Sequence, residues 1–120
     1  MDEIHKTKTY DLEERTFKFT QAIIAFIKKL PRTISNIEIS KQLVRSAGSV
    51  GANYIEANEA LGKKDFLLHV RISRKEAKES RYWLRLVEID DVDKENERQI
   101  LARESQELMN IFGAILRKSE

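Results

Sequence analysis

The sequence contains no cysteine, one proline and four glycines among its 120 residues. The lack of cysteine excludes disulfides, thiolate metal sites and cysteine nucleophiles, and it is consistent with a reducing compartment. The scarcity of proline and glycine argues against a β protein with many turns. Because 35% of the residues are charged, the composition is typical of a single domain built from long helices.

Long hydrophobic runs are also absent. No apolar segment approaches the roughly 20 residues that a membrane span requires, and the polar N-terminus does not resemble a signal peptide. The mean hydropathy of −0.52 points in the same direction. We therefore expect a cytoplasmic protein that does not enter a membrane.

Catalytic patterns are missing as well. A di-iron bundle requires Glu-x-x-His pairs, but the residues three positions before His5 and His69 are Asp2 and Phe66. The sequence contains no nucleophile elbow, no Walker motif and no dinucleotide-binding glycine turn. We expect no catalytic residues, no metal, no cofactor and no enzymatic activity.

What the sequence does contain is a strong helical periodicity. Residues that we expect to face the core recur at alternating spacings of three and four, which is the pattern of bundle helices. They are, helix by helix, Leu12, Thr16, Phe19, Ile23, Phe26 and Leu30; Ser40, Val44, Ala47, Gly51, Tyr54, Asn58 and Leu61; Phe66, Val70, Ser73, Ala77, Ser80, Leu84 and Val87; and Leu101, Leu108, Ile111 and Ile115. Turn and capping signals divide this pattern into helices at 11–29, 36–61, 63–89 and 94–118, preceded by a flexible N-terminal segment at 1–10. Four long helices with short connections predict an all-α, antiparallel up-down-up-down four-helix bundle over residues 11–118.

The expected helix ends depend on local signals. Asp11 and Ser35 are each followed three residues later by a glutamate, which is the pattern of a capping box. Asp93 is the expected N-cap of the last helix. Gly62 is expected to end the second helix in the left-handed conformation.

Small residues occur at corresponding places in the second and third helices. A helical glycine costs about 1 kcal/mol relative to alanine, so the two glycines of the second helix indicate close packing and not a solvent-facing surface. Short side chains let two backbones approach, and we expect these helices to form a tight hairpin. The small residues are Ser46, Ala47, Gly48, Ser49, Gly51, Ala52, Ser73, Ala77 and Ser80.

Polar residues follow both of these helices at spacings of three and four. They are Arg45, Ser49, Asn53 and Glu56 on the second helix and Glu76, Glu79 and Trp83 on the third. Such a set could form a polar pocket. We interpret it instead as a structural or interface network that fixes helix register or subunit orientation, the best attested role of buried polar pairs.

Charge is unevenly distributed although the formal net charge is only +2. Residues 63–85 carry a local charge of +5 and residues 86–112 carry −5. Five cations, which we call the basic ridge, recur at spacings of three and four: Arg71, Arg74, Lys78, Arg81 and Arg85. Lys63, Lys64 and Lys75 add charge nearby. The basic ridge could bind the phosphates of RNA or DNA, or it could pair with the acidic fourth helix or a neighbouring subunit.

More apolar residues are present than one narrow core stripe requires. They can belong to a wide core face or to a subunit interface, and the sequence leaves both possibilities open. The additional residues are Ile24, Ile27, Leu68, Ile72, Tyr82, Leu86, Ile89, Met109, Phe112 and Leu116.

The segments 42–57 and 74–84, together with Asp65-Phe66, resemble a family of bacterial four-helix bundle proteins first noticed as open reading frames in intervening sequences of 23S rRNA genes. Tyr10-Asp11-Leu12 and Leu30-Pro31 fit the same pattern, and the resemblance covers about residues 10–117. It implies a ring-shaped homopentamer and similarity to the accessory variability proteins of diversity-generating retroelements, which act with a reverse transcriptase and nucleic acid. It implies no known enzymatic activity. The family-typical positions are Arg45, Ser46, Ser49, Asn53, Glu56, Asp65, Lys75, Glu76, Glu79 and Trp83.

Taken together, these features predict a non-enzymatic, self-associating bundle that binds RNA or DNA through its third helix. The alternative is a protein-interaction scaffold or accessory subunit that does not bind nucleic acid. In that case the basic ridge and the additional apolar residues contact a protein partner.

Overall fold

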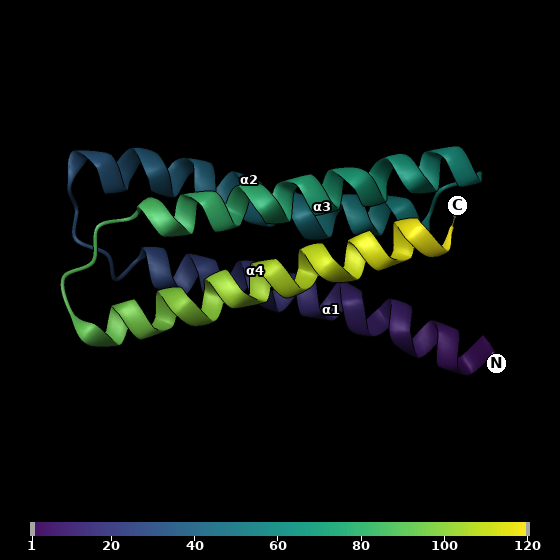
Figure 1. Ribbon diagram of the computed structural model, residues 1–120, viewed down its shortest axis with the longest axis horizontal. Helices are drawn as coiled ribbons and strands as arrows, with labels where there is room; N and C mark the ends of the chain where they lie inside the picture. Colours follow the sequence, from purple (N-terminus) through teal and green to yellow (C-terminus); the bar gives the residue numbers. More distant parts are fainter. Residues whose placement is uncertain (1, 120) are drawn as a thin grey trace.

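The computed structural model describes residues 2–119 and the side chains of residues 11–119. The described chain consists of four α-helices joined by short connections (Figure 1). The helices are α1 (Asp2–Ile27), α2 (Ile34–Asn58), α3 (Lys63–Leu86) and α4 (Val92–Lys118). The predicted all-α four-helix bundle is confirmed.

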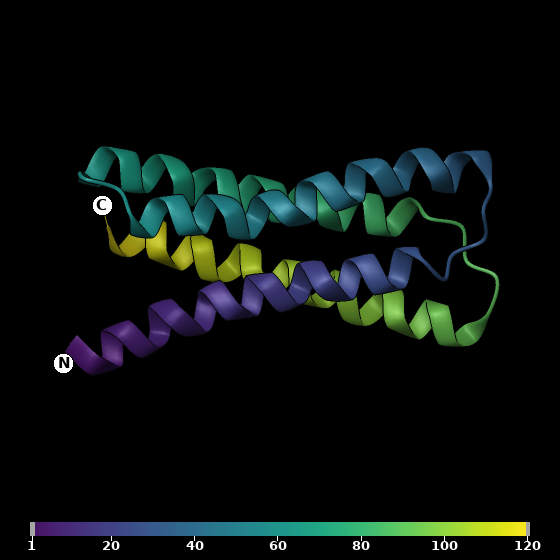
Figure 2. The same ribbon diagram turned by 180° about the vertical axis from the view of Figure 1, so that it is seen from behind.

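The four helices run alternately up and down along an elongated bundle of 47 × 23 × 19 Å, and both termini lie at the same end (Figures 1 and 2). The contact between α2 and α3 is the most extensive, followed by that between α3 and α4. α1 packs against α2 and less extensively against α4. α3 therefore lies between α2 and α4, and its two sides contact different helices.

The helix ends differ from the prediction in α1 and α2. The backbone is helical from Asp2, so Asp11 lies inside α1 and is not its N-cap. The flexibility predicted for residues 1–10 stays a prediction, since the side chains of those residues lie outside the described part. α2 is capped by Thr33, whose Oγ1 accepts a bond from the Asn36 amide at 3.1 Å. The predicted cap, Ser35, lies in the first turn instead and donates to Glu88 at 2.7 Å.

The ends of α3 and α4 also differ from the prediction. Gly62 has an extended backbone (φ −146°, ψ 166°) and is the N-cap of α3, so it does not end α2 in the left-handed conformation. α2 already ends at Asn58, with Glu59 as its C-cap. α4 is capped by Asp91 and not by Asp93, because the Asp91 carboxylate accepts a bond from the Lys94 amide at 2.8 Å.

The predicted core positions of α1 and α3 are confirmed. In α1 all six are buried, and in α3 six of the seven are buried while Phe66 is half-buried. In α4 the predicted Leu101 and Leu108 are buried, and Ile111 and Ile115 are half-buried. The buried ones among these predicted positions are Leu12, Thr16, Phe19, Ile23, Phe26, Leu30, Val70, Ser73, Ala77, Ser80, Leu84 and Val87. Leu30 lies just after α1, and Val87 is the C-cap of α3.

The core face predicted for α2 is partly wrong. Val44 is 40% exposed and Leu61 is fully exposed, whereas Leu43, Val50 and Ala57 are buried. The reason is that α2 packs against both α1 and α3, so its buried surface extends beyond one narrow stripe and is centred on a different row of residues.

The small residues of α2 allow close packing against two neighbouring helices. Toward α3, the Ser46 and Ser80 hydroxyls lie 2.9 Å apart, and the Ser73 hydroxyl donates to the Val50 carbonyl at 2.8 Å. Toward α1, a Cβ atom on Gly51 would lie 2.9 Å from Oγ1 of Thr16, which is closer than side chains tolerate. The serines therefore bring α2 close to α3, as predicted, whereas Gly51 brings it close to α1.

Candidate nucleic-acid interface

The basic ridge and the predicted polar network lie on different sides of α3. At about 100° per residue, the basic ridge is centred roughly 150° around the helix from Glu76 and Glu79. Glu76 faces α2, where it pairs with Arg45, whereas Arg74 extends over Gly113 of α4. The buried stripe of α3 separates the two groups, so they can have independent roles.

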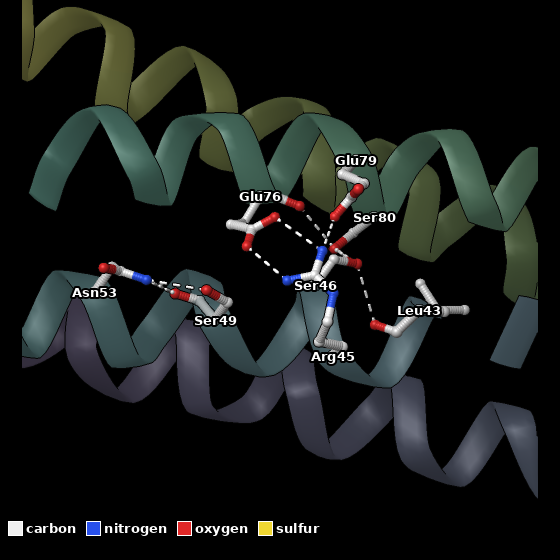
Figure 3. Close-up of polar contacts among 8 residues, drawn as sticks. All are labelled: Leu43, Arg45, Ser46, Ser49, Asn53, Glu76, Glu79 and Ser80. Atoms are coloured by element: carbon white, nitrogen blue, oxygen red, sulfur yellow. Dashed lines mark hydrogen bonds and ion pairs between the residues drawn. The ribbon is translucent and has the colours of Figure 1, made fainter. Parts of the chain in front are cut away.

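Arg45 joins α2 to α3 through two glutamates (Figure 3). Its Nη1 donates to Oε2 of Glu76 at 2.9 Å, its Nη2 donates to Oε1 of Glu76 at 3.3 Å, and Nη2 also pairs with Glu79. Glu76 is only 8% exposed. A charged hydrogen bond of this kind is stronger than a neutral one, and it fixes the two helices in one register.

The two glutamates respond differently to this environment. Burial opposes the ionisation of Glu76, but the hydrogen bond from Arg45 and further polar neighbours outweigh it, so the pKa of Glu76 is lowered. Burial and the interaction with Glu76 raise the pKa of Glu79. The hydrogen bond to Glu76 also raises the pKa of Arg45. At neutral pH the group therefore holds a stable Arg45–Glu76 ion pair beside a more easily protonated carboxylate.

A second polar group continues along the same side of α2. Asn53 Nδ2 donates to the carbonyl and the hydroxyl of Ser49, both at 2.9 Å (Figure 3). On α3, Nδ1 of His69 lies 3.1 Å from Oδ1 of Asn53, and its Nε2 lies 3.6 Å from Asp65. His69 was not predicted to belong to this group, although its spacing of four from Asp65 was a signal for it.

The other two members of the predicted network lie apart from it. Glu56 is exposed, and its side chain forms no hydrogen bond or ion pair within residues 11–119. Trp83 is half-buried and packs edge-to-face on Tyr82, with ring centroids 5.0 Å apart. Its buried Nε1 has no hydrogen-bond partner among the described residues. The structure thus brings together Arg45, Ser49, Asn53, Glu76 and Glu79, and their role at a subunit interface stays a prediction.

The basic side chains of α3 are directed to the surface. Seven of the eight predicted residues are exposed and Arg81 is half-buried. Across residues 11–119, none of the eight is in a hydrogen bond or an ion pair with another side chain. The basic ridge therefore remains available to an external anion.

The acidic residues of α4 are neutralised elsewhere. Arg15 of α1 forms a bidentate pair with Glu104, with both nitrogen–oxygen distances at 2.8 Å. Lys29, just after α1, pairs with Glu97. The prediction that the basic ridge pairs with the acidic fourth helix of the same chain is therefore wrong. The physical reason is that these carboxylates lie on the side of α4 that faces α1.

Two separate surfaces each expose several large apolar side chains, and further large apolar residues are exposed outside them, namely Ile34, Ile37, Val44, Leu61, Val92 and Ile100. Between α1 and α2 lies a groove of about 400 Å³ whose lining includes Phe17, Ile24 and Ile55, with exposed fractions of 57%, 38% and 43%. We call it the α1–α2 groove. Phe17 and Ile55 were not predicted from the sequence as exposed apolar residues, because their exposure depends on how α1 and α2 pack.

The outward face of α3 is the second apolar surface. Leu68, Tyr82 and Leu86 are 50%, 55% and 46% exposed, and we call them the α3 stripe. The other additional apolar residues of α3 and α4 belong at least partly to the core: Phe112 is fully buried, and Ile72, Ile89, Met109 and Leu116 are half-buried. The wide-core and exposed-surface interpretations therefore each hold for some of these residues.

Neither a metal site nor a membrane-spanning helix is found in the described part of the chain. Among the residues that the structure describes, no group of three or more histidine, aspartate or glutamate side chains is arranged to hold a metal ion. Over the same part of the chain, no helix is both long and apolar enough to cross a membrane.

Comparisons with known proteins agree with this architecture. None of the curated proteins compared with the chain matches it. A crystal structure of a protein of unknown function from the S23 ribosomal protein family of Bacteroides thetaiotaomicron is similar, with 27% sequence identity and a TM-score of 0.77. The match covers 92% of this chain and 98% of that one. The family model described as 23S rRNA-intervening sequence protein matches residues 8–114, and the chain therefore belongs to this family.

Proposed function

We propose that the protein is a non-enzymatic, self-associating helical bundle of the cytoplasm that binds RNA or DNA through the basic ridge of α3. The observation that carries this proposal is the absence, within the described residues, of an anionic partner for any of the five ridge cations. From Arg71 to Arg85 the ridge extends about 21 Å at 1.5 Å per residue. An array of this kind suits a polyanion, because each phosphate contact releases counterions.

Self-association would strengthen such binding. A single basic ridge offers few contacts, but several ridges in one assembly act on the same polymer at high effective concentration. The resemblance to ring-shaped homopentamers and the exposed apolar surfaces support an assembly of this kind. Neither the resemblance nor the exposed apolar surfaces requires the protein to be an enzyme.

The ridge is tested by reversing three of its charges, in the variant Arg74→Glu, Lys78→Glu and Arg81→Glu. We expect it to lose nucleic-acid retention while keeping its fold, since none of the three side chains forms a hydrogen bond or ion pair in the described structure. Retention is measured by gel shift at low salt. If all five ridge cations contact phosphates, log K for the wild type should fall against log salt with a slope of about −4.5 for duplex DNA.

A matched control carries Lys18→Glu, Lys28→Glu and Arg32→Glu. These side chains are also exposed, but they lie outside α3. Their substitution changes the net charge by the same amount as the ridge variant. The control should retain binding to a greater extent than the ridge variant. Equal losses in the two variants would show that overall charge, and not the ridge, governs binding.

The alternative, a protein-interaction scaffold, is supported by the exposed apolar lining of the α1–α2 groove. Apolar contacts depend little on ionic strength, whereas phosphate contacts weaken steeply as salt rises. A partner that remains bound in high salt and after nuclease treatment would favour the scaffold.

A further inference from the structure

Two arginines converge over a glycine where the basic ridge meets α4. Gly113 is buried in α4, and Arg117 follows it by about one turn. A Cβ atom placed on Gly113 would lie 3.4 Å from Nη1 of Arg117 and 3.7 Å from Nε of Arg74. The two nitrogens are therefore within about 7 Å of each other, above a position that carries no side chain.

Neither arginine has a counterion in the described part of the chain. Both are exposed, and neither side chain forms a hydrogen bond or ion pair with residues 11–119. Elsewhere the bundle matches arginines between helices with carboxylates, as in Arg15 with Glu104 and Arg45 with Glu76. The pair of Arg74 on α3 and Arg117 on α4 lacks such a match. Two like charges at this separation repel each other, and a bound anion would replace the repulsion with two attractive contacts.

We infer that Arg74 and Arg117 form a seat for one phosphate group above Gly113. Guanidinium groups bind phosphate oxygens through pairs of charge-assisted bonds of about 2.7–2.9 Å, and a phosphate between two such groups can bridge nitrogens at this separation. Because Gly113 has no side chain, both arginine side chains can lie close to the backbone of α4.

The seat extends the proposed interface from α3 onto α4. The charged residues that precede Arg117 in α4 are mainly acidic. The summed charge of this segment therefore did not reveal Arg117 as a candidate. That the phosphate belongs to a nucleic-acid backbone rests on the proposed function. The seat itself does not, because its chemistry fits a free phosphate equally well. The test therefore has one arm for each source.

The first arm uses inorganic phosphate alone. The melting temperatures of the wild type, Arg74→Gln and Arg117→Gln are compared in phosphate and in chloride at equal ionic strength. Lys118→Gln is the matched control. Lys118 is an exposed cation that follows Arg117 in α4, and its substitution removes the same charge as Arg117→Gln. We expect the wild type and the control to gain about 5 °C in phosphate at tenfold excess over Kd, and both arginine variants to lose most of this gain. An Arg117→Gln variant that responds to phosphate like Lys118→Gln would overturn the seat.

The second arm measures the binding of a labelled oligonucleotide over a range of salt concentrations. We expect Arg117→Gln to lower the salt slope by about one unit, and Arg74→Gln with Arg117→Gln to lose less than the sum of the single losses because one phosphate is shared. If the wild type responds to phosphate but binds no nucleic acid, the proposed function fails and the seat holds free phosphate. If the ridge variant loses oligonucleotide binding while Arg117→Gln behaves like Lys118→Gln toward both the oligonucleotide and inorganic phosphate, the proposed function stands and the seat is wrong.

Discussion

Arg45 lies between two glutamates whose pKa values are shifted in opposite directions. Arg45 is half-exposed on its outer side, with 51% of its side chain accessible, whereas only 11% of the Glu76 side chain is accessible. The ion pair is therefore partly screened by solvent, and its contribution to stability is smaller than that of a fully buried pair. The opposite shifts have consequences for stability that can be separated by mutation.

Glu76→Gln is expected to destabilise the bundle by about 1–2 kcal/mol at pH 7, because it removes the carboxylate that pairs with Arg45. The folded pKa of Glu76 lies below its unfolded value, so its contribution is present above the unfolded pKa and is lost as pH falls through the folded pKa. Chemical denaturation between pH 7 and pH 3 should show the difference between wild type and variant shrinking with acid.

Glu79→Gln is expected to change the free energy of unfolding at pH 7 in the direction opposite to that of Glu76→Gln. The folded pKa of Glu79 is raised, so its favourable contribution is present below the unfolded pKa and is lost as pH rises through the folded pKa. The variant should be as stable as the wild type, or slightly more stable, at pH 7, and this gain should vanish in acid. Glu59→Gln, at an exposed position, is the control. If Glu76→Gln and Glu79→Gln show the same pH dependence, the assignment of the two roles is wrong.

At the scale of the helices, the two glycines of α2 have different surroundings. A Cβ atom on Gly51 would meet Thr16 at 2.9 Å, whereas one on Gly48 would meet nothing within 4 Å. Gly48→Ala should therefore stabilise the protein by up to about 1 kcal/mol through helix propensity. Gly51→Ala should destabilise it by about 1–3 kcal/mol, because the overpacking of Thr16 outweighs the same gain. Denaturant midpoints of the two variants should move in opposite directions, and shifts of equal sign would contradict the packing of α1 on Gly51.

How well each helix could be predicted depended on the size of its apolar residues. α1 and α3 present a single regular row, such as Phe19, Ile23 and Phe26 in α1, so the pattern determined the buried face. α2 carries small residues on several sides, and a row through Val44 was as regular as the correct row through Leu43. Only the positions of α1 and α3 on either side of α2 decide between them.

The candidate sites could be predicted only in part, because spacing along one helix does not show which residues of a neighbouring helix lie opposite. The spacing on α2 identified Arg45, Ser49 and Asn53 as one side of a helix, but not which residues of α3 they would meet. Glu56 has the same spacing, but its side chain is exposed and forms no hydrogen bond or ion pair with the described residues. The position of Arg117 beside Arg74 depends on the packing of α4 against α3, which local sequence does not encode.

At the scale of the whole molecule, the bundle carries two apolar surfaces formed by different helices, the α1–α2 groove and the α3 stripe. A two-fold dimer needs one self-complementary surface, whereas a closed ring needs two different surfaces that fit each other. The presence of both a groove and a stripe therefore favours head-to-tail contacts between copies of the chain. Repetition of such a contact around an axis produces a ring, and the resemblance suggests five subunits.

This arrangement makes a prediction about mixtures of variants. Phe17→Glu should disable the groove and Leu68→Glu should disable the stripe, so each variant alone should run as a folded monomer of 14.0 kDa. The wild type should run at about 70 kDa if five copies assemble. Mixing the two variants leaves one intact groove and one intact stripe, and these should join into a dimer of about 28 kDa that cannot grow further. Analytical ultracentrifugation at several concentrations measures all four masses.

Ile100→Glu changes an apolar residue that is 62% exposed outside both surfaces, and it should leave the assembly intact. A mixture that remains monomeric would exclude pairing between the groove and the stripe, since each surface would then have its proposed partner present and still fail to bind.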